Sequence, residues 1–409
     1  MEYLLPDLQR AGAPALGVLA GVVLIGTALF EAFEIIVLPR RASGRLGVAR
    51  FFYIPTWRPY SAIARRLKNT SRRGSVLSLY WPSFLLLLVG VWAAILVLGF
   101  AMLHCAVGSV SGDTQDAGFG TMLYFSGTTF FTLGLGDVVP ASATSRLLTV
   151  AEAGTGFAFL ALLIGYLPIV YQMFARRETN VSLLDQRAGS PPTTAELLRR
   201  NMGGADVSQL IALLRDWEVW VGELLESHLS YPVLAYFRSQ HEDQSWIAAL
   251  ALILDVSAFV LAYGLTGATR QAGFTFAVAR HAVGDLTNVL SLRPTRSKTD
   301  RLDSCSSRRL LEIASISGLL TEQPGPAAER LAEIRSAYEP YLHALADHLL
   351  MTVPAWVPEP GAQDNWETTA WDLTSPAPLL GPNSPFASDP CVSLRPEVAS
   401  GFIRVGESF

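Results

Sequence analysis

Three long apolar runs constrain the fold of this chain more than any other feature of its sequence. They cover residues 15–38, 84–103 and 147–175, and the second run holds no charged residue. A helix needs roughly 20 apolar residues to cross a hydrocarbon layer about 30 Å thick. Each run meets that length, so we expect three transmembrane helices in the first half of the chain.

A glycine-containing motif lies between the second and third runs. Residues 132–137 read Thr-Leu-Gly-Leu-Gly-Asp and follow a stretch of mainly apolar and hydroxyl residues. Gly134 and Gly136 allow backbone angles that a side chain would penalise. Successive carbonyl groups can then point inward together and replace the hydration shell of a cation. The pattern is typical of a cation selectivity filter on a short re-entrant hairpin between two apolar spans.

Residues 124–140 read YFSGTTFFTLGLGDVVP and resemble the pore helix and signature sequence of the potassium-channel family. The resemblance covers residues 84–175 and implies a pore-loop channel of the two-span, one-pore type. It implies a K+ selectivity filter formed by Thr132, Leu133, Gly134, Leu135, Gly136 and Asp137. It also implies a supporting pore helix that carries Phe125, Ser126, Thr128 and Thr129. The chain holds one copy of the motif, so a closed pore requires a homotetramer.

Two positions depart from the family pattern. Leu135 stands where the family most often has an aromatic residue. We therefore expect no hydroxyl tether between filter and pore helix, and packing of Leu135 against Phe125 in its place. Phe131 stands where a second threonine is common, which removes a hydroxyl from the inner mouth. Both departures leave open how strictly the filter excludes Na+.

The third apolar run carries two candidate gating positions. Gly156 lies where inner helices of the family place a hinge, and glycine weakens a helix by roughly 1 kcal/mol relative to alanine. Pro168 removes a backbone hydrogen bond and is a second candidate kink. Alternatively, such residues permit close helix packing in the membrane.

Glu152 is the acidic residue within the third run. Intramembrane carboxylates are unfavourable and usually face a partner or water. We expect Glu152 to be protonated and to hydrogen-bond behind the filter, to Thr128 or Thr129. Arg146 is the competing partner.

Basic residues set the expected orientation. Residues 40–73 hold ten Lys and Arg and no acid, whereas residues 74–145 hold neither Lys nor Arg. The positive-inside rule then places residues 40–73 in the cytoplasm and the pore loop outside. We expect a multi-pass plasma-membrane protein with an external N-terminus and a cytoplasmic C-terminus. The basic segment also interleaves aromatic residues, which suits contact with anionic lipid through Arg50, Arg58, Arg65 and Arg66.

Acidic residues near the spans have two expected roles. Asp113, Asp116 and Asp137 predict an outer vestibule that concentrates cations, although an ordinary solvated loop is the alternative for the first two. Glu31 and Glu34 are expected at the membrane interface, neutralised by Arg40 or Arg41.

The chain after residue 177 has the pattern of a soluble helical domain. Six stretches between residues 195 and 350 carry helical apolar spacing, and Gly and Pro residues separate them. Residues 246–265 are either a buried helix of this domain or a fourth span. We favour the buried helix, because Asp255 would otherwise lie mid-membrane. Residues 354–409 are Pro-rich and predicted to be disordered, and Trp356, Trp366 and Trp371 are candidates for docking on a partner or on the helical domain.

These observations predict an all-α membrane protein: an N-terminal transmembrane helix (1–39), a basic linker (40–81), a pore domain (82–177), a cytoplasmic helical domain (178–353) and a tail (354–409). No catalytic constellation, nucleotide-binding motif or arginine-rich voltage sensor occurs, so we expect no enzyme and no cofactor apart from K+ as the permeant ion. A net charge of −4 disfavours nucleic acid as a partner.

The leading hypothesis is a homotetrameric K+-selective channel that the helical domain gates. Cys105, Cys305 and Cys391 are too far apart in sequence to suggest a metal site. The alternatives are a subunit of a potassium-uptake transporter, and a non-conducting membrane receptor or scaffold that acts through its helical domain.

Overall fold

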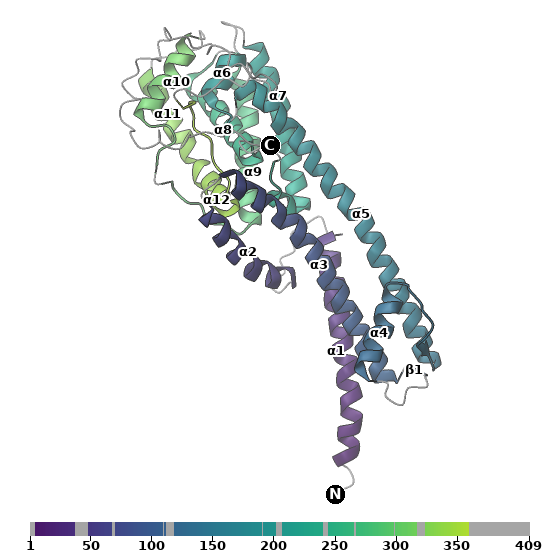
Figure 1. Cartoon of the computed structure of the whole chain (residues 1–409). Helices are drawn as coiled ribbons and strands as arrows, with labels where there is room; N and C mark the ends of the chain where they lie inside the picture. Colours follow the sequence, from purple (N-terminus) through teal and green to yellow (C-terminus); the bar gives the residue numbers. More distant parts are fainter. Residues whose placement is uncertain are drawn as a thin grey trace, which may run out of the picture. The chain divides into compact units, whose positions relative to one another are not determined.

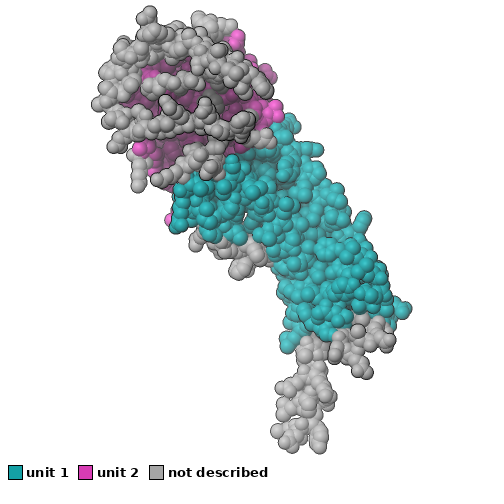
Figure 2. All heavy atoms as spheres, viewed as in Figure 1, with its two compact units in different colours: residues 1–176, 226–238 teal, residues 177–225, 239–409 magenta. Residues whose placement is uncertain are grey.

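The fold is mostly helical and forms two compact units (Figures 1 and 2). The first unit comprises Met1–Arg176 and Glu226–Arg238, and the second comprises Arg177–Leu225 and Ser239–Phe409. The computed structural model describes residues 5–36, 48–67, 70–108, 110–111, 118–189, 191–201, 207–239, 244–265, 267–297, 299–316 and 324–359.

The first unit is built on long helices joined by a hairpin-like insertion. In Figure 1, α4 lies between α3 and α5, at the end of the unit where β1 is labelled. Strand β1 pairs antiparallel with β2, with Val110 opposite Pro140 and Ser111 opposite Val139. The elements with residues in this unit are α1 (Leu5–Ile36), α2 (Val48–Arg66), α3 (Thr70–Val107), β1 (Val110–Ser111), α4 (Phe119–Phe130), β2 (Val139–Pro140), α5 (Ala143–Ala188), the end of α7 (Ser208–Ser230) and the 3-10 helix η1 (Pro232–Tyr236).

Four helices of the described chain are long and apolar enough to cross a membrane. They are Ala15–Ile36 of α1, Arg73–Val107 of α3, Ala143–Ala188 (α5) and Trp246–Tyr263 (α8). In the first three, at most half of the most apolar window is buried within the protein, whereas in α8 the figure is 94%. A lipid-facing helix must leave its apolar side chains uncovered by protein, and α8 does not.

Helix α1 packs closely on α3 through glycines. A Cβ atom at Gly21 would stand 2.7 Å from the Gly99 carbonyl oxygen, so only glycine permits this approach. Farther along the same contact, Trp92 Nε1 donates to Glu31 Oε2 at 2.8 Å, and Glu31 is 4% exposed. Glu31 is therefore covered by α3, and the indole of Trp92 supplies a buried donor to its carboxylate. Arg40 and Arg41 lie outside the described residues.

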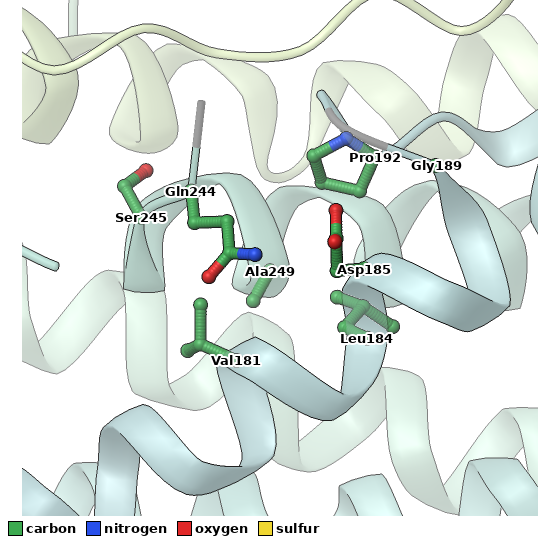
Figure 3. Close-up of a pocket in the computed structure, with 8 residues that line it drawn as sticks. All are labelled: Val181, Leu184, Asp185, Gly189, Pro192, Gln244, Ser245 and Ala249. Carbon is green, nitrogen blue, oxygen red and sulfur yellow. The ribbon is translucent and has the colours of Figure 1, made fainter. Parts of the chain in front are cut away.

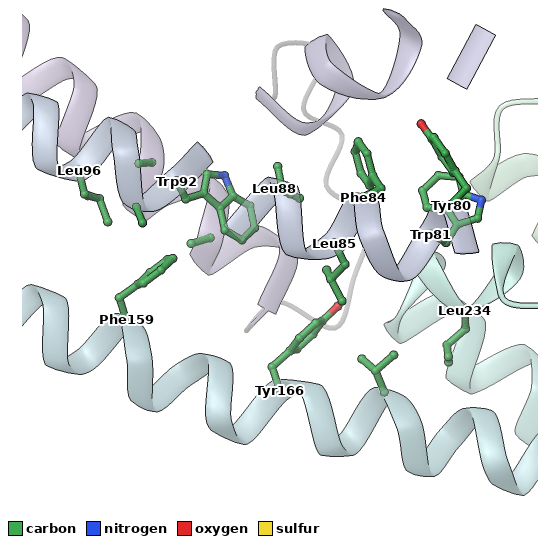
Figure 4. Packing of buried hydrophobic residues seen from close by; sticks show 14 of the residues in the cluster. Tyr80, Trp81, Phe84, Leu85, Leu88, Trp92, Leu96, Phe159, Tyr166 and Leu234 are labelled. Atoms are coloured by element: carbon green, nitrogen blue, oxygen red, sulfur yellow. The ribbon is translucent and has the colours of Figure 1, made fainter. Parts of the chain in front are cut away.

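The core of the first unit lies between α3 and α5. Figure 4 shows Trp92 and Leu96 of α3 facing Phe159 of α5, and Leu85 facing Tyr166. Leu234 of η1 belongs to the same buried cluster, although the sequence places it in the helical domain at 178–353. The boundary expected from sequence is corrected here, because the apolar side chains of residues 226–238 pack on this core.

The second unit surrounds α8 with amphipathic helices. Residues 246–260 of α8 are all buried, and α8 contacts α6, α9, α11 and α12. The last of the six helical stretches expected from sequence, residues 327–350, is divided between α11 and α12, since Pro340 cannot continue the ladder of α11. The remaining helices are α6 (Thr194–Asn201), α9 (Thr269–Val289), α10 (Ser304–Ile316), α11 (Pro324–Ser336) and α12 (Glu339–Leu349).

A buried ionic cluster holds the centre of α8. Arg301 Nη2 pairs with the Asp255 carboxylate, and Tyr338 Oη donates to Asp255 Oδ1 at 2.5 Å. Arg301 also donates to the Pro354 carbonyl at 2.9 Å, next to the fully buried ring of Trp356. The segment 354–359 is therefore part of the packed unit, which corrects its assignment to a disordered tail. Trp366 and Trp371 lie outside the described residues.

A small pocket lies beside the first turn of α8 (Figure 3). It has room for about one water molecule. Its lining includes Asp185, Gln244 and Ser245 together with apolar side chains. A site of this size does not hold an organic ligand.

Candidate ion-conduction site

The filter loop, defined as residues 132–137, begins at the C-terminal end of α4. Thr132 N donates to the Thr129 carbonyl at 3.0 Å, and Leu133 N donates to the Thr128 carbonyl at 2.7 Å. These two bonds are those of a Schellman motif, which ends a helix with a left-handed residue. Thr132 takes that position with φ +57°. A β-branched residue rarely adopts this conformation, so Thr132 is a strained residue at a candidate functional site.

The backbone of the filter loop alternates in handedness. Thr132, Gly134 and Gly136 have φ values of +57°, +55° and +81°, whereas Leu133 and Leu135 do not have positive φ. Alternation of this kind gathers successive N–H groups on one side of the chain and successive carbonyls on the other. Gly134 and Gly136 fit because they carry no Cβ. The sign of φ therefore alternates along the segment that the sequence predicts to be a selectivity filter.

The filter loop is uncovered in the single chain. All residues from 131 to 137 are exposed, including Leu133 at 62% and Leu135 at 64%. Phe125 is buried and lies edge-on to His104 instead. The expected packing of Leu135 against Phe125 is therefore wrong within one chain.

A hydroxyl tether does join the filter loop to α4. Tyr124 Oη donates to Asp137 Oδ2 at 2.8 Å. It is a different bond from the one that an aromatic residue in place of Leu135 would supply, whose absence the sequence predicts. The tether fixes the C-terminal end of the loop, whereas the Schellman bonds fix its N-terminal end.

Behind the filter, Glu152 meets other partners than expected. Glu152 Oε1 contacts Ser126 Oγ, and Glu152 Oε2 lies 2.9 Å from His104 Nε2. The side chains of all three residues are fully buried. Thr128 Oγ1 donates instead to the Phe125 carbonyl at 2.9 Å, in its own helix. The predicted pairing of Glu152 with Thr128, Thr129 or Arg146 is therefore wrong.

His104 is the residue of this site that sequence reasoning missed. Its side chain is fully buried. A lone histidine at the end of an apolar run gives little signal by itself. Its partner Glu152 lies 48 residues away, so only the packing of α3 against α5 reveals the pair.

Gly156 lies where α5 crosses the end of α4. A Cβ atom at this position would stand 2.0 Å from the Phe130 carbonyl oxygen. Of the two roles considered, close packing is therefore the one with a direct structural reason. Helix α5 runs unbroken through Gly156 and Pro168, and Pro168 is exposed.

The structure describes some of the charged residues that are expected around the site. Arg65 and Arg66 are exposed in the last turn of α2. The side chains of Arg50 and Arg58, and the whole of Asp113 and Asp116, lie outside the described part of the structure. Helix α2 is held to α3 by Tyr60 Oη, which donates to the Val76 carbonyl at 2.5 Å, and by a 2.7 Å contact between Thr56 Oγ1 and Tyr80 Oη.

Comparison with known proteins assigns this segment to a class. Residues 90–172 match the family described as an ion channel. They contain α4, the filter loop and the parts of α3 and α5 that enclose them. The resemblance to pore-loop channels of the two-span type is thus confirmed for residues 90–172.

Two relatives support a membrane protein. The inward rectifier potassium channel Kirbac3.1 of Paramagnetospirillum magnetotacticum is 28% identical over 106 residues, which are 26% of this chain and 35% of the relative. The uncharacterized membrane protein YdjJ of Bacillus subtilis (strain 168) is 26% identical over 202 residues, 48% of this chain and 58% of the relative. The chain thus spans less than two thirds of either relative. No solved structure gives a significant match.

Proposed function

We propose that the protein is a homotetrameric, K+-selective channel that conducts K+ passively through the filter loop. The observation that carries the proposal is the alternating φ of Thr132, Gly134 and Gly136 at the end of a pore helix. Four such loops around an axis would present rings of carbonyl oxygens to a dehydrated cation. The match to the ion-channel family and the similarity to a potassium channel support the same function.

The proposed tetramer is supported by the exposure of the filter loop in the single chain. Leu133 and Leu135 are exposed apolar side chains on a loop with a single copy per chain. One loop cannot surround an ion, and fourfold rotational symmetry closes the ring. We further propose that α1, α3 and α5 span the plasma membrane, with the N-terminus outside and the second unit in the cytoplasm. Helix α2 would then lie along anionic lipid, with Arg65 and Arg66 at the headgroups.

Helix α8 is proposed as a core helix of the second unit and not as a fourth span. Its most apolar window is 94% buried within the protein. Asp255 at its middle is paired with Arg301. A membrane crossing would have to break this pair and uncover the surrounding helices, both of which are unfavourable.

Gating is proposed to act through residues 226–238, here named the coupling segment. It lies between two stretches of the second unit in sequence, but its side chains pack in the first unit. Tyr231 contacts Tyr166 with ring centroids 5.8 Å apart, and Phe237 contacts Phe174 at 5.7 Å. Both partners lie on the inner helix α5. A rearrangement of the second unit would therefore pull on α5 through this segment.

A flux assay tests the channel. Purified protein in vesicles, with opposed K+ and Na+ gradients, should pass K+ faster than Na+ and should have the mass of a tetramer in detergent. Gly134→Ala should abolish selective flux, because alanine at φ +55° is strained. Gly154→Ala is the matched control, because a Cβ there meets no atom within 4 Å. Equal K+ flux in Gly134→Ala and the wild type would refute the proposal.

A further inference from the structure

A buried hydrogen-bonded cluster joins three helices behind the filter. It comprises His104 on α3, Ser126 on α4 and Glu152 on α5. Ser126 Oγ contacts Glu152 Oε1 and also lies 2.8 Å from the carbonyl oxygen of Val97 on α3. Each of the three side chains is 0% exposed, so solvent does not complete these interactions.

The Ser126 hydroxyl has one hydrogen and two oxygen neighbours. The Val97 carbonyl can only accept a hydrogen bond. An ionised Glu152 could also only accept. The single Ser126 hydrogen would then serve one of the two contacts, and in the other contact two oxygen atoms would meet with no hydrogen between them. The same conflict arises if the Glu152 proton sits on Oε2, toward His104. Unmade hydrogen bonds are unfavourable where water is excluded.

A neutral Glu152 with its hydrogen on Oε1 removes the conflict. The acid then donates to Ser126, and Ser126 donates to the Val97 carbonyl. Glu152 Oε2 accepts from His104 in the tautomer that carries hydrogen on Nε2. Each of the three contacts then holds one hydrogen, and the cluster has no net charge, as a site closed to water favours.

Within the described chain, His104 is the titratable group that faces Glu152 in this cluster. Phe125 covers the other side of the His104 ring, with centroids 4.9 Å apart. Five other ionisable side chains of the neighbouring elements are exposed or bonded elsewhere. They are Glu31, Cys105, Tyr124, Asp137 and Arg146.

We propose that Glu152 is a positioning residue that works as a neutral carboxylic acid, and that His104 and Ser126 complete the relay that fixes α4. Its effect on conduction rests on the proposed function. Ser126 belongs to the helix whose C-terminal carbonyls hold the filter loop. Loss of the Glu152 proton would draw the Ser126 hydrogen from Val97 to the carboxylate and bring charge into the closed site. Conduction should therefore fall when Glu152 ionises.

Infrared difference spectroscopy tests the protonation state without any need for conduction. The spectrum of the wild-type tetramer minus that of Glu152→Gln, at neutral pH, should contain the C=O band of a protonated carboxylic acid. Carboxylate bands in its place would overturn the proposal. In titration, the acid band should convert to carboxylate over the same pH range in which flux declines.

Flux measurements test the positioning role. Glu152→Gln should keep wild-type K+ flux at neutral pH and lose its pH dependence, because the amide donates to Ser126 as the acid did. Glu152→Leu has similar size but no polar atoms, and it should lose at least about tenfold in flux while it remains tetrameric. A pH profile shared by the wild type and Glu152→Gln would overturn the positioning role. A wild type that shows the acid band but no flux would instead refute the proposed channel.

Discussion

Gly156 of α5 lies directly against the carbonyl group of Phe130, the last residue of α4. A Cβ atom at Gly156 would stand 2.0 Å from that oxygen, far inside van der Waals contact. The end of α4 also provides the carbonyls that hold Thr132 and Leu133. The inner helix α5 therefore packs against the same last turn of α4 whose carbonyls hold the filter loop.

We expect Gly156→Ala to displace the end of α4 and to reduce K+ flux strongly. Overpacking of this kind costs about 1–3 kcal/mol. Gly154→Ala, two residues away, should retain flux, since its Cβ meets no atom within 4 Å. Flux in vesicles and tetramer mass in detergent check both variants. Equal K+ flux in Gly156→Ala and Gly154→Ala would show that conduction does not depend on the contact between Gly156 and Phe130.

Tyr124→Phe should weaken selectivity without loss of the fold. The change removes only the hydroxyl that donates to Asp137 at 2.8 Å. Without this hydrogen bond, the end of the filter loop at Asp137 becomes less rigid. The ratio of K+ to Na+ flux is the measurement, and Tyr171→Phe, on α5, is a control. An unchanged ratio in Tyr124→Phe would show that the tether does not support the filter.

Tyr236→Ala should change the fraction of time that the channel is open and leave its unitary conductance unaltered. Tyr236 of the coupling segment stacks on Trp81, with ring centroids 3.7 Å apart. Tyr236→Phe keeps the ring and should behave as the wild type does. Single-channel recording separates the two quantities. Altered conductance with normal gating would contradict a coupling role.

Arg301→Met should destabilise the second unit by about 3–5 kcal/mol, because it leaves the Asp255 carboxylate buried without its cation. Asp255 raises the pKa of Arg301 above its usual value even though burial acts in the opposite direction, so the guanidinium remains charged. Arg296→Met, at an exposed position, is the matched control. Thermal unfolding followed by circular dichroism reports the difference. Equal midpoints for the two variants would contradict the importance of the pair.

The second unit should lose stability as the pH falls below about 6.5, the ordinary value for histidine. Burial lowers the pKa of His343 and of His348. The unfolded chain therefore takes up protons first on acidification, so stability is full above the unfolded pKa and declines below it. His343→Gln with His348→Gln should flatten this dependence, whereas His281→Gln, at a position 70% exposed, should not. Unfolding midpoints between neutral and mildly acidic pH decide the matter.

The helical spans and the pore-loop family were accessible from sequence because both are local properties. A run such as 84–103 shows its membrane character through length and composition alone. The motif at 132–137 indicates a cation filter from sequence alone, because the backbone freedom of glycine is a property of the residue itself. The match at residues 90–172 confirms the family that this motif indicated.

Tertiary structure decided which residues meet. The pair of His104 and Glu152 spans 48 residues, and the bond between Trp92 and Glu31 spans 61. The sequence around one residue of such a pair does not indicate the other residue, since the contact forms only when two helices pack. The same holds for α8, whose composition suits a membrane and whose burial depends on its neighbours. Sequence by itself therefore determined the elements and the filter motif, whereas packing alone assigned partners to the buried polar groups.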